Sequence, residues 1–182
     1  MKINLKQISE EELWKYVGKH LADNGFDAVL VGGAVVSIYT DGAYQSGDLD
    51  FIIQNLSKEK LPFVMNKIGF IKTGKNYIHP DCNHLFVEFP SGPLGIGEDY
   101  NIKEVEEDYQ GTKIKILSPT DCIKDRLASY IYWDAKECLD QAILVALAHK
   151  FNHSSVKRWC EGEQSIHVYK EFEKILKSRS NN

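Results

Sequence analysis

Hydrophobic residues near the start of the chain recur every three or four positions, which is the spacing of an amphipathic helix. Ser9 and Glu12 open this pattern as a capping box, in which each side chain satisfies a backbone N–H group of the other residue. Asn24 and Gly25 follow the last periodic position and are typical of a helix end. The pattern therefore predicts a helix that begins after Ser9 and ends at Asn24.

Short apolar runs and further stretches of helical spacing follow this first helix. The apolar runs predict strands over residues 26–31, 48–53, 70–73, 77–79, 85–89 and 113–117. The helical spacing predicts helices over residues 34–39, from a cap at Ser57 to residue 68, and over 119–131, 134–149, 153–161 and 164–177. Residues 98–108 carry six acids and one lysine, which indicates a loop or a solvated face.

The order of these elements predicts an α/β (α+β) fold. Strands and helices mix in residues 1–117, which we interpret as an α/β core. Only helices follow in residues 118–182, which we interpret as a helical C-terminal extension packed on that core.

Composition and charge narrow the classes of protein that fit. The 182 residues are 43% hydrophobic and 26% charged, which is the balance of a globular chain. The formal net charge is -4, so no bulk positive field attracts nucleic acid. Four scattered cysteines favour a reducing compartment. The N-terminus lacks an apolar signal region and the longest apolar stretch, residues 142–148, is too short to span a bilayer, so we expect a cytoplasmic protein without a membrane partner.

Two aspartates at the start of a predicted strand carry the first candidate chemistry. Asp48 and Asp50 are two residues apart, so both carboxylates point to one face of the strand. Two carboxylates held together repel each other, and a divalent cation such as Mg²⁺ removes that repulsion. The alternative is an exposed strand end with two solvated acids.

A glycine pair ends the preceding predicted strand. Gly32 and Gly33 lie between that strand and a helix, where bare backbone can approach an anion. The alternative is a tight strand-to-helix turn. No third glycine follows at Rossmann spacing and no Gly-Lys-Ser/Thr sequence is present, so a dinucleotide fingerprint and a P-loop are both excluded.

The combination of these motifs resembles the nucleotidyltransferase superfamily of DNA polymerase beta type. The resemblance extends to its minimal nucleotidyltransferases and AbiE-like toxin transferases, and it implies a mixed β-sheet flanked by helices. It further implies that Gly32 and Gly33 contact nucleotide phosphates and that Asp48 and Asp50 bind a pair of Mg²⁺ ions. Ser46 matches a small hydroxyl residue that is common in the family at this spacing.

The same resemblance requires a third carboxylate on a neighbouring strand. Glu88 lies within an apolar run, an unusual place for glutamate without a partner, and we predict that it completes the metal site. The alternative for Glu88 is an acid at a sheet edge that faces water. Asp99 is the second candidate for this role, although it lies in acid-rich sequence that is typical of a loop.

A cation close to the phosphates is expected for this chemistry. Lys124 and Arg126 lie in the predicted helix that begins at Pro119, and this segment loosely resembles a lysine-containing helix of the AbiE-like branch. We therefore predict that Lys124 and Arg126 bind the nucleotide. The alternative is a charged helix face with pairing between neighbouring turns.

These residues predict a Mg²⁺-dependent transfer of a nucleotidyl group from an NTP to an acceptor that the sequence leaves open. RNA such as tRNA, a protein hydroxyl or a small molecule are the candidate acceptors. The alternative is a binding module of the same fold with weak or no catalysis, such as one half of a toxin–antitoxin-type pair with a protein partner. An arginine often precedes the first acid by about four residues in the AbiE-like pattern, and Tyr44 at that place favours the alternative.

A zinc site is the remaining metal hypothesis. His79, Cys82 and His84 are close in sequence, but no second pair of ligands follows at a spacing typical of zinc proteins. Cys122 and Cys138 fall within predicted helices and are expected to be small core residues.

Overall fold

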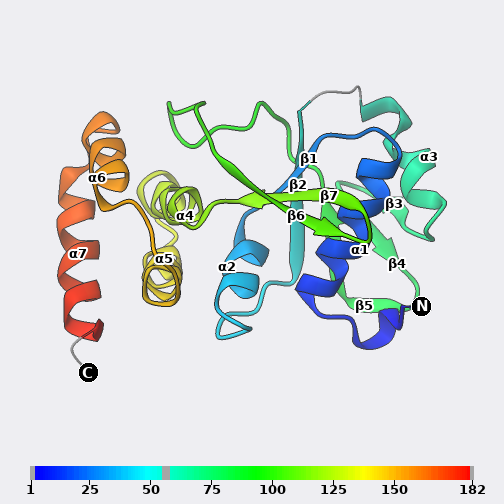
Figure 1. Cartoon of the computed structure of the whole chain (residues 1–182), viewed down its shortest axis with the longest axis horizontal. Helices are drawn as coiled ribbons and strands as arrows, with labels where there is room; N and C mark the ends of the chain where they lie inside the picture. Colours follow the sequence, from blue (N-terminus) through cyan, green and yellow to red (C-terminus); the bar gives the residue numbers. More distant parts are fainter. Residues whose placement is uncertain (1–2, 55–57, 181–182) are drawn as a thin grey trace.

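The centre of the chain is a mixed β-sheet with helices packed beside it (Figure 1). The structure is a computed structural model that describes residues 3–54 and 58–180. Within these residues the sheet has seven strands in the order β3-β4-β5-β2-β1-β7-β6. The predicted α/β (α+β) fold with a mixed sheet is therefore confirmed.

The observed elements agree closely with the predicted ones. The strands are β1 (Ala28–Val31), β2 (Asp48–Ile53), β3 (Ile71–Thr73), β4 (Asn76–His79), β5 (Cys82–Glu88), β6 (Glu104–Tyr109) and β7 (Thr112–Leu117). The α-helices are α1 (Glu10–Asp23), α2 (Gly33–Tyr39), α3 (Leu61–Asn66), α4 (Pro119–Trp133), α5 (Glu137–Ala148), α6 (His153–Gly162) and α7 (Ile166–Ser180), and short 3₁₀ turns are η1 (Leu5–Gln7) and η2 (Lys58–Lys60). The predicted cap at Ser57 lies outside the described residues.

Helix α1 begins where the sequence predicts. The backbone N–H of Glu12 donates to Ser9 Oγ at 3.2 Å, and the backbone N–H of Ser9 donates to Glu12 Oε2 at 3.0 Å, so the capping box is formed. The apolar face of the helix buries Leu13, Trp14 and Val17 against the sheet, and the Trp14 indole donates to the carbonyl of Lys115 in β7 at 3.2 Å. The helix thereby covers the sheet beside β1 and β7.

The central strands β1, β2 and β5 align the acidic positions. Strand β2 pairs antiparallel with β1 and parallel with β5. In this register Asp50 lies opposite Val31 on one side and opposite Glu88 on the other. The turn after β1 therefore lies at the same end of the sheet as the two aspartates.

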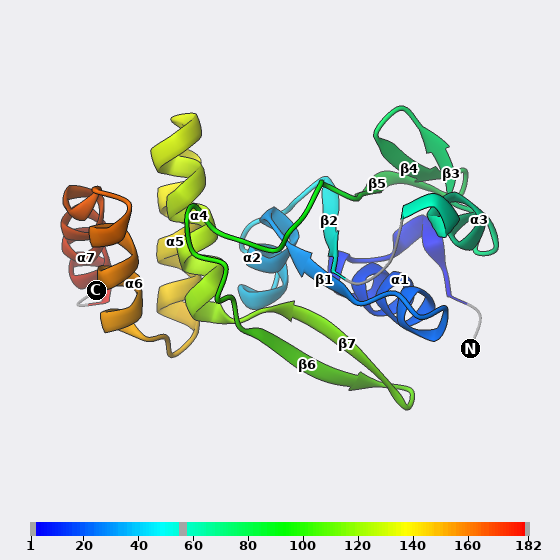
Figure 2. The same ribbon diagram turned by 90° about the horizontal axis from the view of Figure 1, so that it is seen from above.

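The sequence predicts a loop or a solvated face for segment 98–108, and the structure shows that its second half is strand β6, whose side chains are all exposed or half-buried. Strand β6 pairs antiparallel with β7 along its whole length and the two form a twisted arm (Figure 2). Lysines offset the repulsion among its acids, since Lys113 Nζ lies 2.7 Å from Glu106 and Lys115 Nζ lies 3.2 Å from Glu104. The charge pattern obscured a strand because the compensating lysines belong to the next strand.

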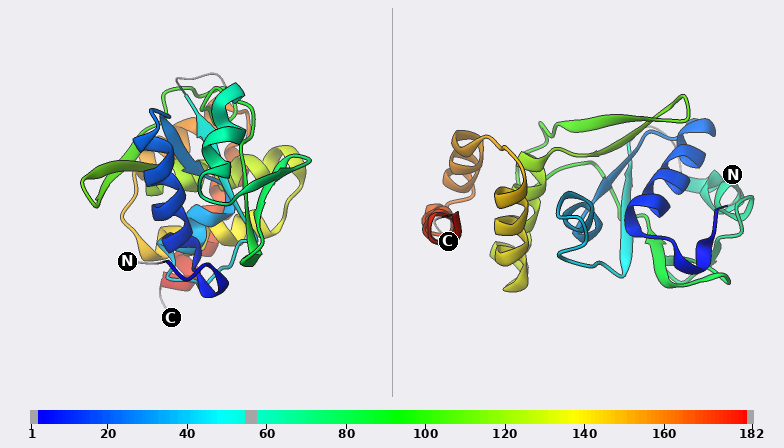
Figure 3. Two further views of the ribbon diagram at one scale, coloured as in Figure 1. Left: turned by 90° about the vertical axis from the view of Figure 1, so that its right-hand side faces the viewer. Right: turned by 60° about the horizontal axis from the view of Figure 1, so that its bottom comes forward.

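The helices after Ser118 form a separate layer at one end of the sheet. Figures 1 and 3 show α4 and α5 between the sheet and the outer pair α6 and α7. Buried side chains continue from the sheet through α2 into these helices, with Leu127 of α4 and Ile143 of α5 fully buried. A division into parts 1–117 and 118–182 stays a prediction. No helix of the described residues is long and apolar enough to cross a membrane.

The capping box at the start of α1 makes a measurable contribution to stability. Replacing the cap by Ser9→Ala leaves the first-turn N–H of Glu12 without its acceptor, so we expect the free energy of unfolding to fall by about 1 kcal/mol. Urea unfolding followed by circular dichroism measures the change. Ser91→Ala, in an exposed loop, is the matched control and should stay within about 0.5 kcal/mol of the unmodified protein. Equal losses for both variants would contradict the role of the cap.

Candidate functional site

The predicted acid pair lies on one face of β2. Asp48 and Asp50 are half-buried, whereas Leu49 and Phe51 between and beyond them are fully buried on the opposite face. This alternation follows from the two-residue period of a strand. The two carboxylates therefore project together from the start of an otherwise apolar strand.

Glu88 joins this face from the neighbouring strand. It is the direct register partner of Asp50, and its side chain is 13% exposed. Strand β5 lies between β4 and β2, so the alternative of a sheet-edge acid does not apply. The structure thus brings together the three carboxylates that the sequence analysis singled out.

The electrostatics of Asp50 reflect this crowding. Burial, followed by the charges of Asp48 and Glu88, raises the pKa of Asp50 from 3.8 to about 7. The Arg126 guanidinium acts in the opposite direction but does not outweigh the other contributions. The positive charge near the site is too weak to keep the Asp50 carboxyl fully ionised near neutral pH.

The glycine pair allows the turn after β1 to approach the acids. Gly32 has φ +78°, and a Cβ at this position would lie 2.7 Å from Asp50 Oδ2. A Cβ on Gly33 would lie 3.0 Å from Ser46 Oγ and 3.4 Å from the Tyr44 ring. The positive φ and the close approach together require glycine at residue 32.

Ser46 orients the first aspartate. Its hydroxyl donates to Asp48 Oδ1 at 2.8 Å, and its backbone N–H donates to Glu10 Oε1 at 3.1 Å. Glu10 lies in the first turn of α1, so the start of that helix holds the loop before β2. The sequence analysis included Ser46 but missed Glu10, because helix and loop are far apart in the chain.

Arg126 approaches the acids from helix α4. Its guanidinium lies 2.6 Å from Asp125 Oδ2 and donates to Gln141 Oε1 of α5 at 3.3 Å. Burial is the largest single effect and lowers the pKa of Arg126, but the charge of Asp125, its hydrogen bond to the guanidinium, and Cys122 and Cys138 together raise that pKa above its usual value. Arg126 therefore stays charged beside Asp50 and Tyr44, whose pKa values it lowers. The sequence analysis did not predict contributions from Asp125 and Gln141.

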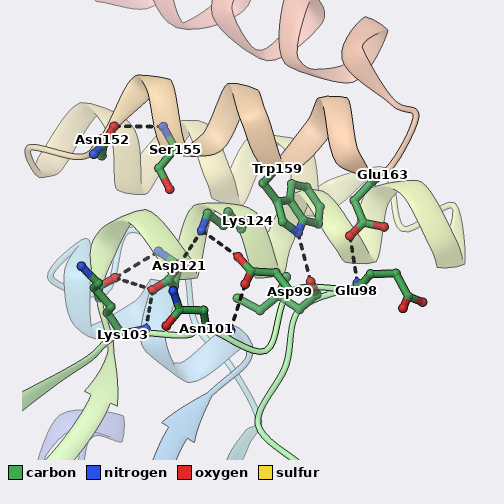
Figure 4. Close-up of polar contacts among 12 residues, drawn as sticks. Glu98, Asp99, Asn101, Lys103, Asp121, Lys124, Asn152, Ser155, Trp159 and Glu163 are labelled. Atoms are coloured by element: carbon green, nitrogen blue, oxygen red, sulfur yellow. Dashed lines mark hydrogen bonds and ion pairs between the residues drawn. The ribbon is translucent and has the colours of Figure 1, made fainter.

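Lys124 and Asp99 lie in a different place. Residues 124 and 126 are separated by about 200° around a helix, so they face opposite directions. Lys124 Nζ forms ion pairs with Asp121 at 2.9 Å and with Asp99 at 3.3 Å (Figure 4). Both predicted residues thus belong to a separate polar cluster, and Glu88 alone of the two candidate third acids is adjacent to the aspartates.

Comparison with solved structures identifies the fold. Over 78% of this chain and 75% of the other, the structure is similar to an antigenic nucleotidyltransferase-like protein from Paracoccidioides brasiliensis, with a TM-score of 0.53 and 16% identity. ANT(2")-Ia in complex with adenylyl-2"-tobramycin is similar over 89% of this chain and 97% of its own, with a TM-score of 0.51 and 11% identity. The chain has a nucleotidyltransferase-like fold. No protein-family model matches the sequence, and no curated protein matches it either.

The donors beside Asp50 are of the kind that Mg²⁺ prefers, but their side chains do not converge on one point. Among the described residues, no three His, Cys, Asp or Glu side chains are grouped closely enough to hold an ion. Lys75 Nζ, on an 81% exposed side chain, lies 3.2 Å from Glu88 Oε1. Asn76, the register partner of Glu88 on β4, has a buried side-chain oxygen without a hydrogen-bond partner. Carboxylate and amide oxygens are ligands that Mg²⁺ accepts, so the residues fit the ion.

The zinc hypothesis finds no support in the geometry. His84 Nε2 is hydrogen-bonded to the carbonyl of Ile8 at 2.8 Å, and His79 Nδ1 accepts from the backbone of Asp81 at 3.0 Å. Cys82 is buried and its thiol donates to the carbonyl of Leu85. Each of the three side chains is thus engaged by backbone. Cys122 and Cys138 are buried core residues, as predicted.

The pKa of Asp50 predicts how stability depends on pH. Between pH 3.8 and about 7 the folded protein holds a proton at Asp50 that the unfolded chain has lost. The contribution of Asp50 to the free energy of unfolding therefore falls as pH rises through that window and stays constant at higher pH. In EDTA at pH 8, Asp50→Asn should raise the free energy of unfolding by about 1–3 kcal/mol, with a smaller gain at pH 5.

Urea unfolding at both pH values measures this difference. Asp41→Asn, in the exposed loop before β2, is the control and should show no such pH dependence. A loss of stability in Asp50→Asn that is equal at pH 5 and pH 8 would contradict the raised pKa.

The contact between Gly32 and Asp50 predicts a difference between two glycine substitutions. Gly32 and Gly42 have φ values of +78° and +76°, but a Cβ on Gly42 would meet nothing within 4 Å. Both variants to alanine incur the backbone strain, at about 1 kcal/mol, whereas Gly32→Ala also displaces the Asp50 carboxylate. We expect Gly32→Ala to lower the free energy of unfolding by about 1 kcal/mol more than Gly42→Ala does. Equal unfolding free energies would contradict the contact.

Proposed function

We propose that the chain is a Mg²⁺-dependent nucleotidyltransferase that moves a nucleotidyl group from an NTP to a hydroxyl acceptor. The observation that carries the proposal is that Asp48, Asp50 and Glu88 lie on one face of two neighbouring strands, where burial and the charges of the other two acids raise the pKa of Asp50 to about 7. The nucleotidyltransferase-like fold supports it, because the acids lie beside the turn of Gly32 and Gly33.

The three carboxylates hold a pair of Mg²⁺ ions in this proposal. When bound, Mg²⁺ increases the acidity of an acceptor hydroxyl and offsets the charge of the triphosphate and of the departing pyrophosphate. Asp48, which Ser46 orients, and Glu88, whose present partner Lys75 is exposed, would hold the ions. Asp50 would bind in its ionised form, because a carboxylate ligand must be deprotonated.

The remaining residues position the nucleotide. Bare backbone at Gly32 and Gly33 lets phosphate oxygens approach the acids without a side chain in the way. Ser46 is close to the same turn and can direct its hydroxyl to a phosphate once Asp48 is a ligand. Arg126 contributes positive charge, held by Asp125 and Gln141. Lys124 has no such role in the proposal, because its ion pairs are in the separate cluster.

A small-molecule hydroxyl is the acceptor class with the most support. The net charge of -4 and the acidic site are unfavourable for a long polyanion such as RNA. A structural relative, ANT(2")-Ia, has been solved with an adenylylated aminoglycoside, which is a small molecule. A protein hydroxyl and a short RNA end stay open as acceptors of the same chemistry.

A binding module with weak catalysis is the second candidate function. The Tyr44 ring lies against the place where a Gly33 side chain would be, beside the turn that is proposed to bind phosphate. An aromatic ring there narrows the approach of a triphosphate. This observation favours a chain that retained the fold and binds a protein partner.

Calorimetric titration with each NTP in the presence of Mg²⁺ separates the two candidates. We expect the unmodified protein to bind at least one NTP, and the double variant Asp48→Asn/Asp50→Asn to lose that binding by more than tenfold, because it lacks metal ligands. Asp41→Asn is the control for the same chemical change outside the site.

The other outcomes of this titration contradict different parts of the proposal. Binding that survives in EDTA or in the double variant would overturn the metal site. Absence of binding to any NTP would overturn the transferase proposal and favour the binding module.

A further inference from the structure

An open cavity lies on the other side of helix α4 from Arg126. It has a volume of about 740 Å³ and is bounded by the loop before β6, the first turns of α4, and helix α6. Figure 4 shows the cap residue Asn152 and Ser155 and Trp159 of α6 on one side of this space, with Asp121 and Lys124 of α4 on the other. Pockets of about 300–1,000 Å³ are of the size that binds small molecules.

The floor of the cavity is a buried ion pair. Lys124 and Asp121 are 5% and 3% exposed, and Lys124 also contacts Asp99. Backbone N–H groups satisfy these acids as well, since Lys103 N donates to Asp121 Oδ2 at 2.9 Å and Asn101 N donates to Asp99 Oδ1 at 2.9 Å. Two carboxylates and one ammonium leave the floor with one net negative charge, and hydrogen bonds hold both carboxylates in place.

Of the two glutamates at the rim of the cavity, Glu163 is hydrogen-bonded and Glu98 points away. Glu163 accepts from the backbone N–H of Glu98 at 2.9 Å and from the hydroxyl of Tyr132. The Glu98 side chain points away from the residues around the cavity in Figure 4. Hydrogen bonds thus orient three of the four lining carboxylates, and the fourth points away from the cavity.

The unused groups of the lining are donors. Lys103 and Arg158 line the cavity, and among residues 3–54 and 58–180 neither cationic head group has an ion-pair or hydrogen-bond partner. The Ser155 hydroxyl likewise has none within the described chain. The ten-residue helix α6 begins at His153, so its N-terminal partial positive charge adds to these cations.

We propose that this cavity binds a small molecule that carries a phosphate group, up to the size of a nucleotide. Two free cations, a free hydroxyl and the start of a helix supply donors to a compact oxyanion. The volume leaves room for a polar body beside Asn101 and Asn152. The site requires no metal and shares no residue with the three-carboxylate site, so the proposal goes beyond the transferase function and does not depend on it.

NMR titration of the full chain in EDTA tests the proposal, with inorganic phosphate, AMP and adenosine as probes. The indole N–H of Trp159 donates to the carbonyl of Ile96 at 3.0 Å in the cavity wall, so its signal reports occupation. We expect phosphate and AMP to shift this signal and adenosine to leave it unchanged. The same shifts should occur in the Asp48→Asn/Asp50→Asn variant.

Charge-removing variants locate the site. Arg158→Gln and Lys103→Gln should each weaken AMP binding about tenfold, because each removes one charge-assisted contact. Lys157→Gln, on the same helix but outside the cavity lining, is the matched control and should bind AMP normally.

Three outcomes would overturn the proposal. They are no response to phosphate or AMP, an equal loss in Lys157→Gln and Arg158→Gln, and loss of binding in the Asp48→Asn/Asp50→Asn variant. The last result would assign the ligand to the three-carboxylate site instead. Failure of NTP binding in Mg²⁺ with retained AMP binding in EDTA would remove the transferase function and leave this cavity site intact.

Discussion

Repulsion among three carboxylates on neighbouring strands is the constraint on which much of the site depends. The parallel register of β2 and β5 brings Glu88 beside Asp50. The fold tolerates the three acids because each has a hydrogen bond, an ion pair or a bound proton that offsets its charge. Ser46 holds Asp48, Lys75 contacts Glu88, and Asp50 accepts a proton near neutral pH. Gly32 then lets the backbone approach the Asp50 carboxylate more closely than a residue with a side chain would allow.

Helix α4 divides the polar groups of the protein into two sets. One face carries Arg126 toward the acids of the sheet, and the opposite face carries Lys124 into a closed pair with Asp121. Buried ions need partners, and each cation of α4 has an aspartate one or three residues away. The helix therefore supports two separate polar sites without exposing an unpaired buried charge on either face.

Much of the fold could be predicted because its signals are local. The capping box of Ser9 and Glu12, the alternation through Asp48 and Asp50, and the glycine pair each act over a few residues. Glu88 could be singled out by its place in an apolar run, but its approach to Asp50 depends on the strand register. The spacing of Lys124 and Arg126 puts them on opposite faces of a helix, but which face meets the acids depends on how α4 packs.

Some elements could not be predicted for equally physical reasons. Lys113 and Lys115 of the next strand pair with two of the four acids of β6, and a pattern read along one segment does not include its neighbour. Lys75 and Asn76 lie near the acids because β4 pairs with β5, and nothing in the sequence around them indicates that position.

The same acidic strand has a consequence for the protein in concentrated solution. Strand β6 is one open edge of the sheet, with unpaired backbone groups that another chain could extend into an aggregate. Its cluster of acids makes a second copy of itself a poor partner, since like charges would face each other across the new pair. The other edge, β3, is only three residues long. Charge at one border and brevity at the other keep the sheet from growing beyond its own chain.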